Sequence, residues 1–108
     1  MQDCKVNILG TEYKITLKEL KDSDVDGFTD YTEKAIVIRS DNYNEVGNFE
    51  WLQKKQLRHE LIHAFMAESG LQANWEHVQK FGHDETTVDW IAIQSPKMFK
   101  VFQELDIL

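Results

Sequence analysis

Residues 48–70 read NFEWLQKKQLRHELIHAFMAESG, and this stretch predicts the element around which the chain folds. Its middle part, residues 57–66, places apolar side chains around most of a helical circumference, which is typical of a buried central helix. Asn48 is a residue type that caps helix starts, and Gly70 stands where a left-handed C-terminal cap belongs. The sequence therefore predicts one long helix from about residue 48 to residue 69.

The part of the chain before this helix is typical of β structure. Residues 6–8 and 13–17 alternate apolar and polar side chains with a period of two, and residues 10–12 between them contain a glycine, so a hairpin is expected. Residues 35–39 read AIVIR, a run rich in β-branched side chains that predicts a further strand. The aspartate-rich residues 22–27 separate these elements and predict a loop.

The chain after the long helix is expected to contain two further helices. Residues 71–82 read as a connection with room for a short helical turn, and residues 84–94 are expected to be helical, with acids in the first turn where the helix dipole favours them. Ser95 and Pro96 are expected to cap and start a last helix. Strands first and helices afterwards predict an α+β fold, in which a small sheet packs on the long helix in a single domain of 108 residues.

The composition is that of a globular protein, and it limits the function classes. The chain has 12 Lys and Arg residues against 19 Asp and Glu residues, a net charge of −7, which argues against binding to nucleic acid or to an anionic membrane. No apolar stretch approaches the ~18 residues of a membrane span. The single cysteine, Cys4, rules out an internal disulfide, so the cytoplasm is the expected compartment.

Residues 59–63 read HELIH, an HExxH motif inside the long helix. His59 and His63 are four residues apart on one helix face, so both imidazoles can reach one metal ion. Glu60 projects ~100° from His59 around the helix axis, which places its carboxylate beside the ion. Zinc with histidine ligands and an open position lowers the pKa of a water molecule toward ~7, and a neighbouring glutamate can take the proton. The motif therefore predicts one zinc ion, with Glu60 as general base.

A catalytic zinc site needs a third protein ligand, and the candidates follow the motif in the chain. Glu85 and Asp89 are four residues apart, so they share one face of a largely apolar helix, where like charges repel each other unless a cation lies near. A metal ion would relieve Glu85, and a hydrogen bond from the outer nitrogen of a ligand histidine would relieve Asp89. The other candidate ligands are His77, His83 and Asp84.

The pattern HExxH followed by ExxxD at residues 85–89 resembles the gluzincin branch of the zinc metallopeptidases. Residues 59–65 (HELIHAF), 68–71 (ESGL) and 88–92 (VDWIA) resemble short metallopeptidase-like proteins of phages and bacteria. The resemblance implies a minimal zincin-like fold that spans residues 1–108. For a phage-encoded chain, the expected compartment would be the host cytoplasm.

The same resemblance implies a role for each of five side chains. The zinc ligands would be His59, His63 and Glu85, and the general base would be Glu60. Asp89 would hydrogen-bond one of the ligand histidines. The implied activity is the zinc-dependent hydrolysis of peptide bonds in a peptide or protein substrate.

One feature of the larger gluzincins, a Tyr or His after the third ligand that stabilises the oxyanion, is missing. No Tyr or His follows His83, so the donor would have to be Tyr31, Tyr43, His77 or His83, or be absent. A weaker resemblance to SprT-like proteases, which use HExxH with a downstream histidine, would make His77 or His83 the third ligand. Glu85 is favoured, because the acid four residues after it also fits the helix pattern.

Two other functions stay open from the residues alone. The chain could be a zinc-stabilised binding module without turnover, such as a phage-type regulator or inhibitor, or a metal-free interaction domain with hydrogen-bonded core histidines. Glu60 discriminates between these functions, because a structural zinc site needs no base there. In a peptidase, residues 35–39 would either form the cleft edge that pairs with an extended substrate or lie inside the sheet.

Overall fold

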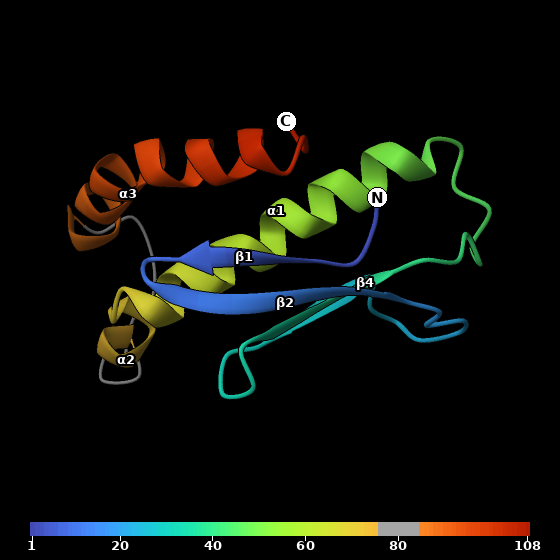
Figure 1. Cartoon of the computed structure of the whole chain (residues 1–108), viewed down its shortest axis with the longest axis horizontal. Helices are drawn as coiled ribbons and strands as arrows, with labels where there is room; N and C mark the ends of the chain where they lie inside the picture. Colours follow the sequence, from blue (N-terminus) through green and yellow to red (C-terminus); the bar gives the residue numbers. More distant parts are fainter. Residues whose placement is uncertain (76–84) are drawn as a thin grey trace.

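The computed structural model describes residues 1–75 and 85–108, and it confirms the α+β fold (Figure 1). A four-stranded sheet comes first in the chain, and helices follow it. None of the helices in these two ranges has the length and apolarity that a membrane span requires. The elements are β1 (Cys4–Ile8), β2 (Thr11–Lys18), β3 (Gly27–Asp30), β4 (Ala35–Arg39), α1 (Phe49–Glu68), α2 (Leu71–Trp75) and α3 (Glu85–Glu104).

The sheet is mixed and has the strand order β1-β2-β4-β3. The expected hairpin of β1 and β2 is confirmed as an antiparallel pair, whereas β2 pairs with β4 in parallel and β4 pairs with β3 antiparallel. The hairpin turns on Leu9 and Gly10, whose φ angles are 51° and 96°. Two consecutive left-handed residues close a tight two-residue turn. The expected turn at residues 10–12 is therefore placed slightly too late, because β2 already begins at Thr11.

β4 lies inside the sheet, between β2 and β3. Its residues Ile36 and Ile38 are fully buried in the core. The sequence left two alternatives for residues 35–39, a strand at the edge of the cleft or a strand inside the sheet. The second alternative is correct, and these residues form no cleft edge. The edge on this side of the sheet is β3, whose four residues are too few to give a clear alternating pattern in the sequence.

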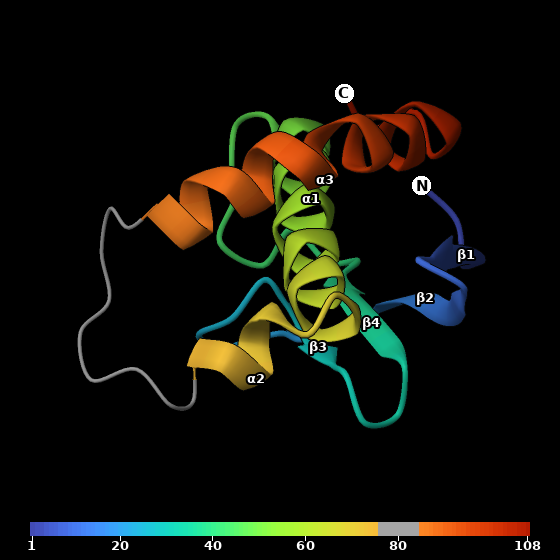
Figure 2. The same ribbon diagram turned by 90° about the vertical axis from the view of Figure 1, so that its left-hand side faces the viewer.

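α1 packs on one face of the sheet, and in Figure 2 it lies between the sheet and α3. Its expected ends are confirmed, because the side chain of Asn48 accepts a hydrogen bond from the amide of Trp51 at 3.1 Å and Gly70 has a φ of 84°. The expectation of a helix buried around most of its circumference is wrong, since the buried side chains form one stripe. They are Leu57, Glu60, Leu61, Ala64 and Phe65.

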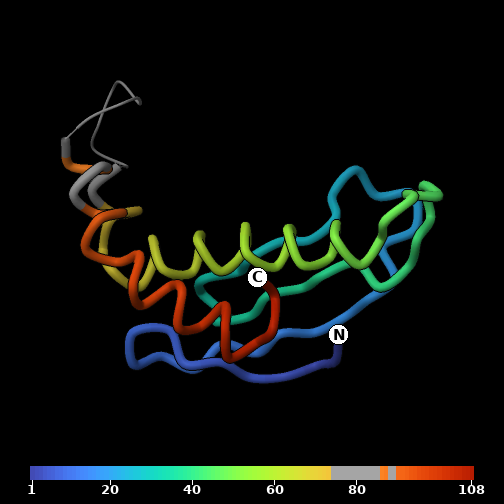
Figure 3. Tube along the Cα trace, turned by 90° about the horizontal axis from the view of Figure 1, so that it is seen from above, coloured from blue at the N-terminus to red at the C-terminus, as the bar shows by residue number. Residues whose placement is uncertain are grey.

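α3 is one continuous helix that crosses α1 (Figures 2 and 3). The expected helix start at Ser95 and Pro96 is therefore wrong, because Pro96 lies inside α3. Trp90 before the proline and Met98 and Phe102 after it are all buried, so one apolar stripe continues past the proline. Burial on both sides offsets the ~3 kcal/mol that an interior proline costs a helix. The short α2 agrees with the helical turn expected after the long helix.

Candidate metal centre

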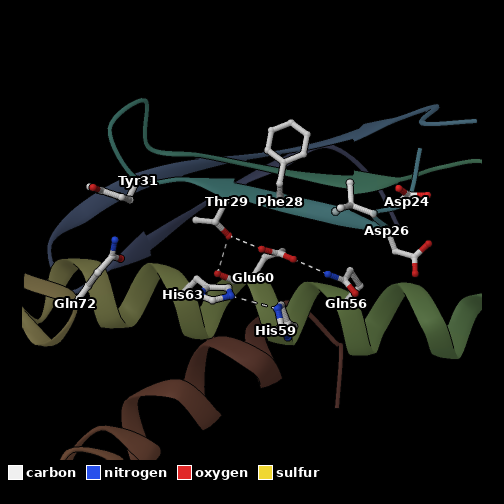
Figure 4. A pocket seen from close by; sticks show the side chains of 12 residues that line it. Asp24, Asp26, Phe28, Thr29, Tyr31, Gln56, His59, Glu60, His63 and Gln72 are labelled. Atoms are coloured by element: carbon white, nitrogen blue, oxygen red, sulfur yellow. Dashed lines mark hydrogen bonds between the residues drawn. The ribbon is translucent and has the colours of Figure 1, made fainter. Parts of the chain in front are cut away.

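His59 and His63 lie one turn apart on the flank of α1 that the core leaves exposed (Figure 4). Their Nε2 atoms are 3.2 Å apart, and the two ring planes meet at 75°. Two nitrogen ligands at about 2.05 Å from a tetrahedral zinc ion are separated by about 3.3 Å. The separation of the two imidazoles is therefore that of two ligands of one zinc ion, and it is also that of a direct hydrogen bond between the two rings.

Glu60 lies between the histidine pair and the sheet, and its side chain is buried, with 3% of the residue exposed. The hydroxyl of Thr29 donates to Oε1 of Glu60 at 2.8 Å, and the side-chain amide of Gln56 donates to Oε2. Donor atoms of His59, Glu60 and His63 all lie within 4.8 Å of one another. The carboxylate is thus held beside the histidine nitrogens, at a distance suited to a shared water molecule.

Thr29 reaches Glu60 because β3 runs close to α1. Gly27 and Thr29 are two residues apart, so they lie on the same face of β3, and Figure 4 shows Thr29 pointing toward the helix. A methyl group at Gly27 would lie 2.7 Å from the carbonyl oxygen of Val37 and 3.2 Å from Cγ of Gln56. Glycine at position 27 therefore avoids a clash with the backbone of β4, and it also leaves room for Gln56 of α1.

A cleft of about 550 Å³ opens between α1 and β3 beside the histidine pair. α1 contributes Gln56 and the HExxH side chains, whereas β3 and the loop before it contribute the opposite wall. Among the described residues that line the cleft, Asp24 and Asp26 add carboxylates, and none is a Lys or Arg. The charge of the lining therefore favours a cation in the cleft.

The loop before β3 is fixed by Arg39, the last residue of β4, which is only 2% exposed. Its guanidinium pairs with Asp26 and with Asp41, each at 3.1 Å. It also donates to main-chain carbonyls of Lys21, Ser23 and Val25. A buried guanidinium with this many acceptors holds the cleft wall in one conformation.

The predicted oxyanion donors lie in different places. Tyr31 follows β3 and lines the cleft, with 43% of its surface exposed (Figure 4). Tyr43 lies in the loop before α1, is 56% exposed and does not line the cleft. Of the two tyrosines, only Tyr31 lines the cleft, and Figure 4 shows it at the end of the cleft away from His59.

The predicted third ligand begins α3. Glu85 is the first residue of this helix and Asp89 follows one turn later, but both side chains lie outside the described part of the chain. The alternative ligands His77, His83 and Asp84 also lie outside the described residues. Among the side chains that the structure describes, the cluster of possible ligands consists of His59, Glu60 and His63.

Most residues of the cleft wall were missed by reasoning from the sequence, and three of them are polar side chains beside the HExxH residues or Tyr31. Gln56 is one turn before Glu60 on the same helix, so its spacing was a readable signal. Thr29 gave no such signal, because its contact with Glu60 spans 31 positions in the chain. Gln72, on α2, lines the cleft at the end where Tyr31 lies (Figure 4).

Comparison of the chain with protein-family models, with curated proteins and with solved structures finds no match. The fold and the site therefore define the class of this protein. It is an α+β domain with a His-Glu-His cluster on the wall of a cleft, and this cluster has the geometry of a metal site.

Proposed function

We propose that this chain is a zinc-dependent peptidase whose ion is held by His59, His63 and Glu85. The observation that carries the proposal is the 3.2 Å separation of the two histidine Nε2 atoms on the wall of an open cleft. Both histidines are exposed, which suits a catalytic site with a free coordination position better than a closed structural site. The geometry therefore favours the peptidase over the zinc-stabilised binding module.

Glu60 is the general base in this proposal. Zinc bound at the cluster would polarise a peptide carbonyl and lower the pKa of a water molecule toward ~7. The carboxylate of Glu60 faces the same space, within 4.8 Å of the histidine donor atoms. It can take the proton of the attacking water and deliver it to the leaving amine.

The free edge of β3 supplies a binding mode for the substrate. The amide of Arg39 in β4 donates to the carbonyl of Asp26, just before β3. Along an antiparallel pair only every second residue bonds to the neighbouring strand, so Phe28 is the next residue of β3 that bonds to β4. The backbone N–H and C=O groups of Gly27 and Thr29 therefore point to the outer edge of the sheet. In the described part of the chain, β3 pairs with β4 alone. An extended peptide can add to this edge as a further strand and lie along the cleft.

Tyr31 is the proposed donor to the oxyanion, because Tyr31 lines the cleft whereas Tyr43 does not; its side chain would have to turn toward the histidine pair to donate. Asp89 is proposed to hydrogen-bond a ligand histidine, which would fix the tautomer of that imidazole. The cytoplasm remains the proposed compartment, since Cys4 is a free thiol that a reducing environment preserves.

The experiment compares metal content and cleavage of fluorescein-labelled casein in the wild type and in Glu60→Gln. The wild type is expected to cleave, and Glu60→Gln is expected to retain zinc while cleavage falls by at least ~100-fold. Glu50→Gln, an exposed glutamate in the first turn of α1, serves as the matched control and should behave as the wild type. Undiminished turnover in Glu60→Gln would show that Glu60 is not the general base. A wild type that binds zinc but does not cleave casein would favour the zinc-stabilised binding module.

A further inference from the structure

The carboxylate of Glu60 accepts a side-chain hydrogen bond on each of its two oxygens, from Thr29 on one and from Gln56 on the other. We propose that Thr29 and Gln56 are positioning residues that fix the carboxylate of Glu60 beside the histidine pair. The proposal deepens the peptidase function and rests on it for its catalytic consequence. Its structural part, the hold on Glu60, stands on the geometry alone.

Burial makes these two hydrogen bonds decisive for the orientation of Glu60. Only 3% of Glu60 is exposed, so a donor that is removed leaves a carboxylate oxygen with little access to solvent. A carboxylate with one donor on each oxygen is restrained in position and also in rotation about its last bond. The two donors come from different elements, β3 and α1, and each restrains one oxygen.

Thr29 ties the sheet edge to both the main chain and the side chain of Glu60. Its hydroxyl oxygen lies 3.0 Å from the carbonyl oxygen of Glu60 and 2.8 Å from Oε1. A hydroxyl carries one hydrogen, which can turn between these two acceptors. The single side chain of Thr29 therefore sets the distance between β3 and α1 at the point where the base lies.

Gln56 lies on α1 one turn before Glu60, on the side of the helix that faces β3. A methyl group at Gly27 would lie 3.2 Å from its Cγ, so a side chain on β3 at this position would press on Gln56. The glycine therefore leaves room for Gln56 to reach Glu60. β3 supplies one donor to Glu60 directly, on the same strand whose free edge would bind substrate, and it leaves space for the other donor.

The kinetic arm of the test uses Thr29→Val, which replaces the hydroxyl with a methyl of similar size. Misplacement of a catalytic group by ~1 Å costs on the order of 10²-fold in rate, so kcat for labelled casein should fall about 10–100-fold while KM changes less than about 3-fold. Thr29→Ser keeps the hydroxyl and should restore most of kcat. Thr16→Val, at a strand threonine of β2, is the matched control.

The second arm does not depend on activity. Urea midpoints and zinc content are measured for the proteins as purified: wild type, Thr29→Val, Glu60→Leu and the double variant. If Thr29 holds the carboxylate, Thr29→Val lowers the midpoint clearly in the wild-type background and much less in the Glu60→Leu background. If Thr29→Val fails to fold by circular dichroism, Gln56→Met takes its place in both arms, since it removes the other donor.

The outcomes separate this proposal from the proposed function. Non-additive midpoints together with a loss of kcat that Thr29→Ser reverses would support the positioning role. Additive midpoints, an unchanged kcat in Thr29→Val, or an equal loss in Thr29→Ser would overturn it. A wild type that cleaves no casein would contradict the proposed peptidase function. The urea midpoints would still decide whether Thr29 holds Glu60.

Discussion

The indole nitrogen of Trp90 donates a hydrogen bond to the side-chain oxygen of Ser69 at 2.7 Å. Ser69 ends α1, and Trp90 lies in the first half of α3 with only 8% of its surface exposed. The bond therefore ties the helix that begins with Glu85 to the helix that carries the HExxH motif. The proposed third ligand depends on this relation between α1 and α3.

Ser69→Ala should destabilise the fold by about 1–3 kcal/mol, because it leaves the buried indole N–H of Trp90 without its acceptor. For a domain of this size the melting temperature should fall by ~4–8 °C for each kcal/mol. Ser95→Ala in α3, whose hydroxyl has only a long 3.5 Å contact with the carbonyl of Ala92, is the control. Equal melting temperatures for the two variants would show that the indole contact contributes nothing.

Glu85→Ala should lower the zinc content of the purified chain strongly, because it removes the proposed third ligand. Glu104→Ala, at the opposite end of α3, is the matched control and should retain the wild-type zinc content. Metal is measured by mass spectrometry after purification without a tag. A wild-type zinc content in Glu85→Ala would show that Glu85 is not the third zinc ligand, and His77, His83 or Asp84 would then be the candidates.

Glu68 makes the stability of the fold sensitive to acid. Its carboxylate accepts hydrogen bonds from the hydroxyl of Tyr13 at 2.8 Å and from the ammonium of Lys34 at 2.6 Å. Burial alone would raise the pKa of Glu68, but the bonds from Lys34 and Tyr13 outweigh it and hold the pKa below the ordinary value of 4.5. The pKa of Glu68 is lower in the folded state than in the unfolded state. Its carboxylate therefore stabilises the fold at pH values above the ordinary pKa, and this stabilisation is lost as the pH falls through the folded-state pKa.

The corresponding experiment measures urea midpoints of the wild type and of Glu68→Gln at pH 7 and at pH 3. The midpoint of the wild type should fall more over this range, since Glu68→Gln has no carboxylate to protonate at that position. Glu104→Gln, an exposed glutamate, should follow the wild type. An identical midpoint difference in wild type and Glu68→Gln would contradict the role given to this residue.

Gly27→Ala should destabilise the fold by about 1–3 kcal/mol, because the added methyl would lie 2.7 Å from the backbone oxygen of Val37, which cannot move aside easily. The same methyl would press on Gln56 at 3.2 Å and so disturb the support of Glu60. Gly47→Ala is the matched control, since a methyl at Gly47 meets nothing within 4 Å. Thermal melts of the two variants test the close approach of Gly27 in β3 to the backbone of β4, and equal melting temperatures would contradict it.

The parts of the fold that could be predicted were those with a local signal. The caps of α1 at Asn48 and Gly70 and the one-turn spacing of His59 and His63 depend on residues close together in the chain. The ends of α1 were predicted correctly for this reason. The approach of the two imidazoles follows from this one-turn spacing, whereas the position of the Glu60 carboxylate beside them also depends on Thr29.

The parts that could not be predicted depend on contacts between distant residues. The parallel pairing of β2 with β4 places β4 inside the sheet and leaves the short β3 at the edge, and no local pattern encodes this. The contact of Thr29 with Glu60 exists only because of that arrangement. Local rules favour a helix start at Pro96, whereas burial of Trp90 and Met98 on either side of it keeps α3 continuous.

The most direct test of the central claim is the zinc content of the tag-free chain, measured for the wild type and for His63→Ala. The 3.2 Å separation of the histidine nitrogens predicts about one zinc ion per wild-type chain and a strong loss in His63→Ala. The melting temperature should fall with the metal, since a bound ion stabilises only the folded state. A wild-type chain that purifies without metal, or a His63→Ala variant that keeps a full zinc ion, would contradict the account.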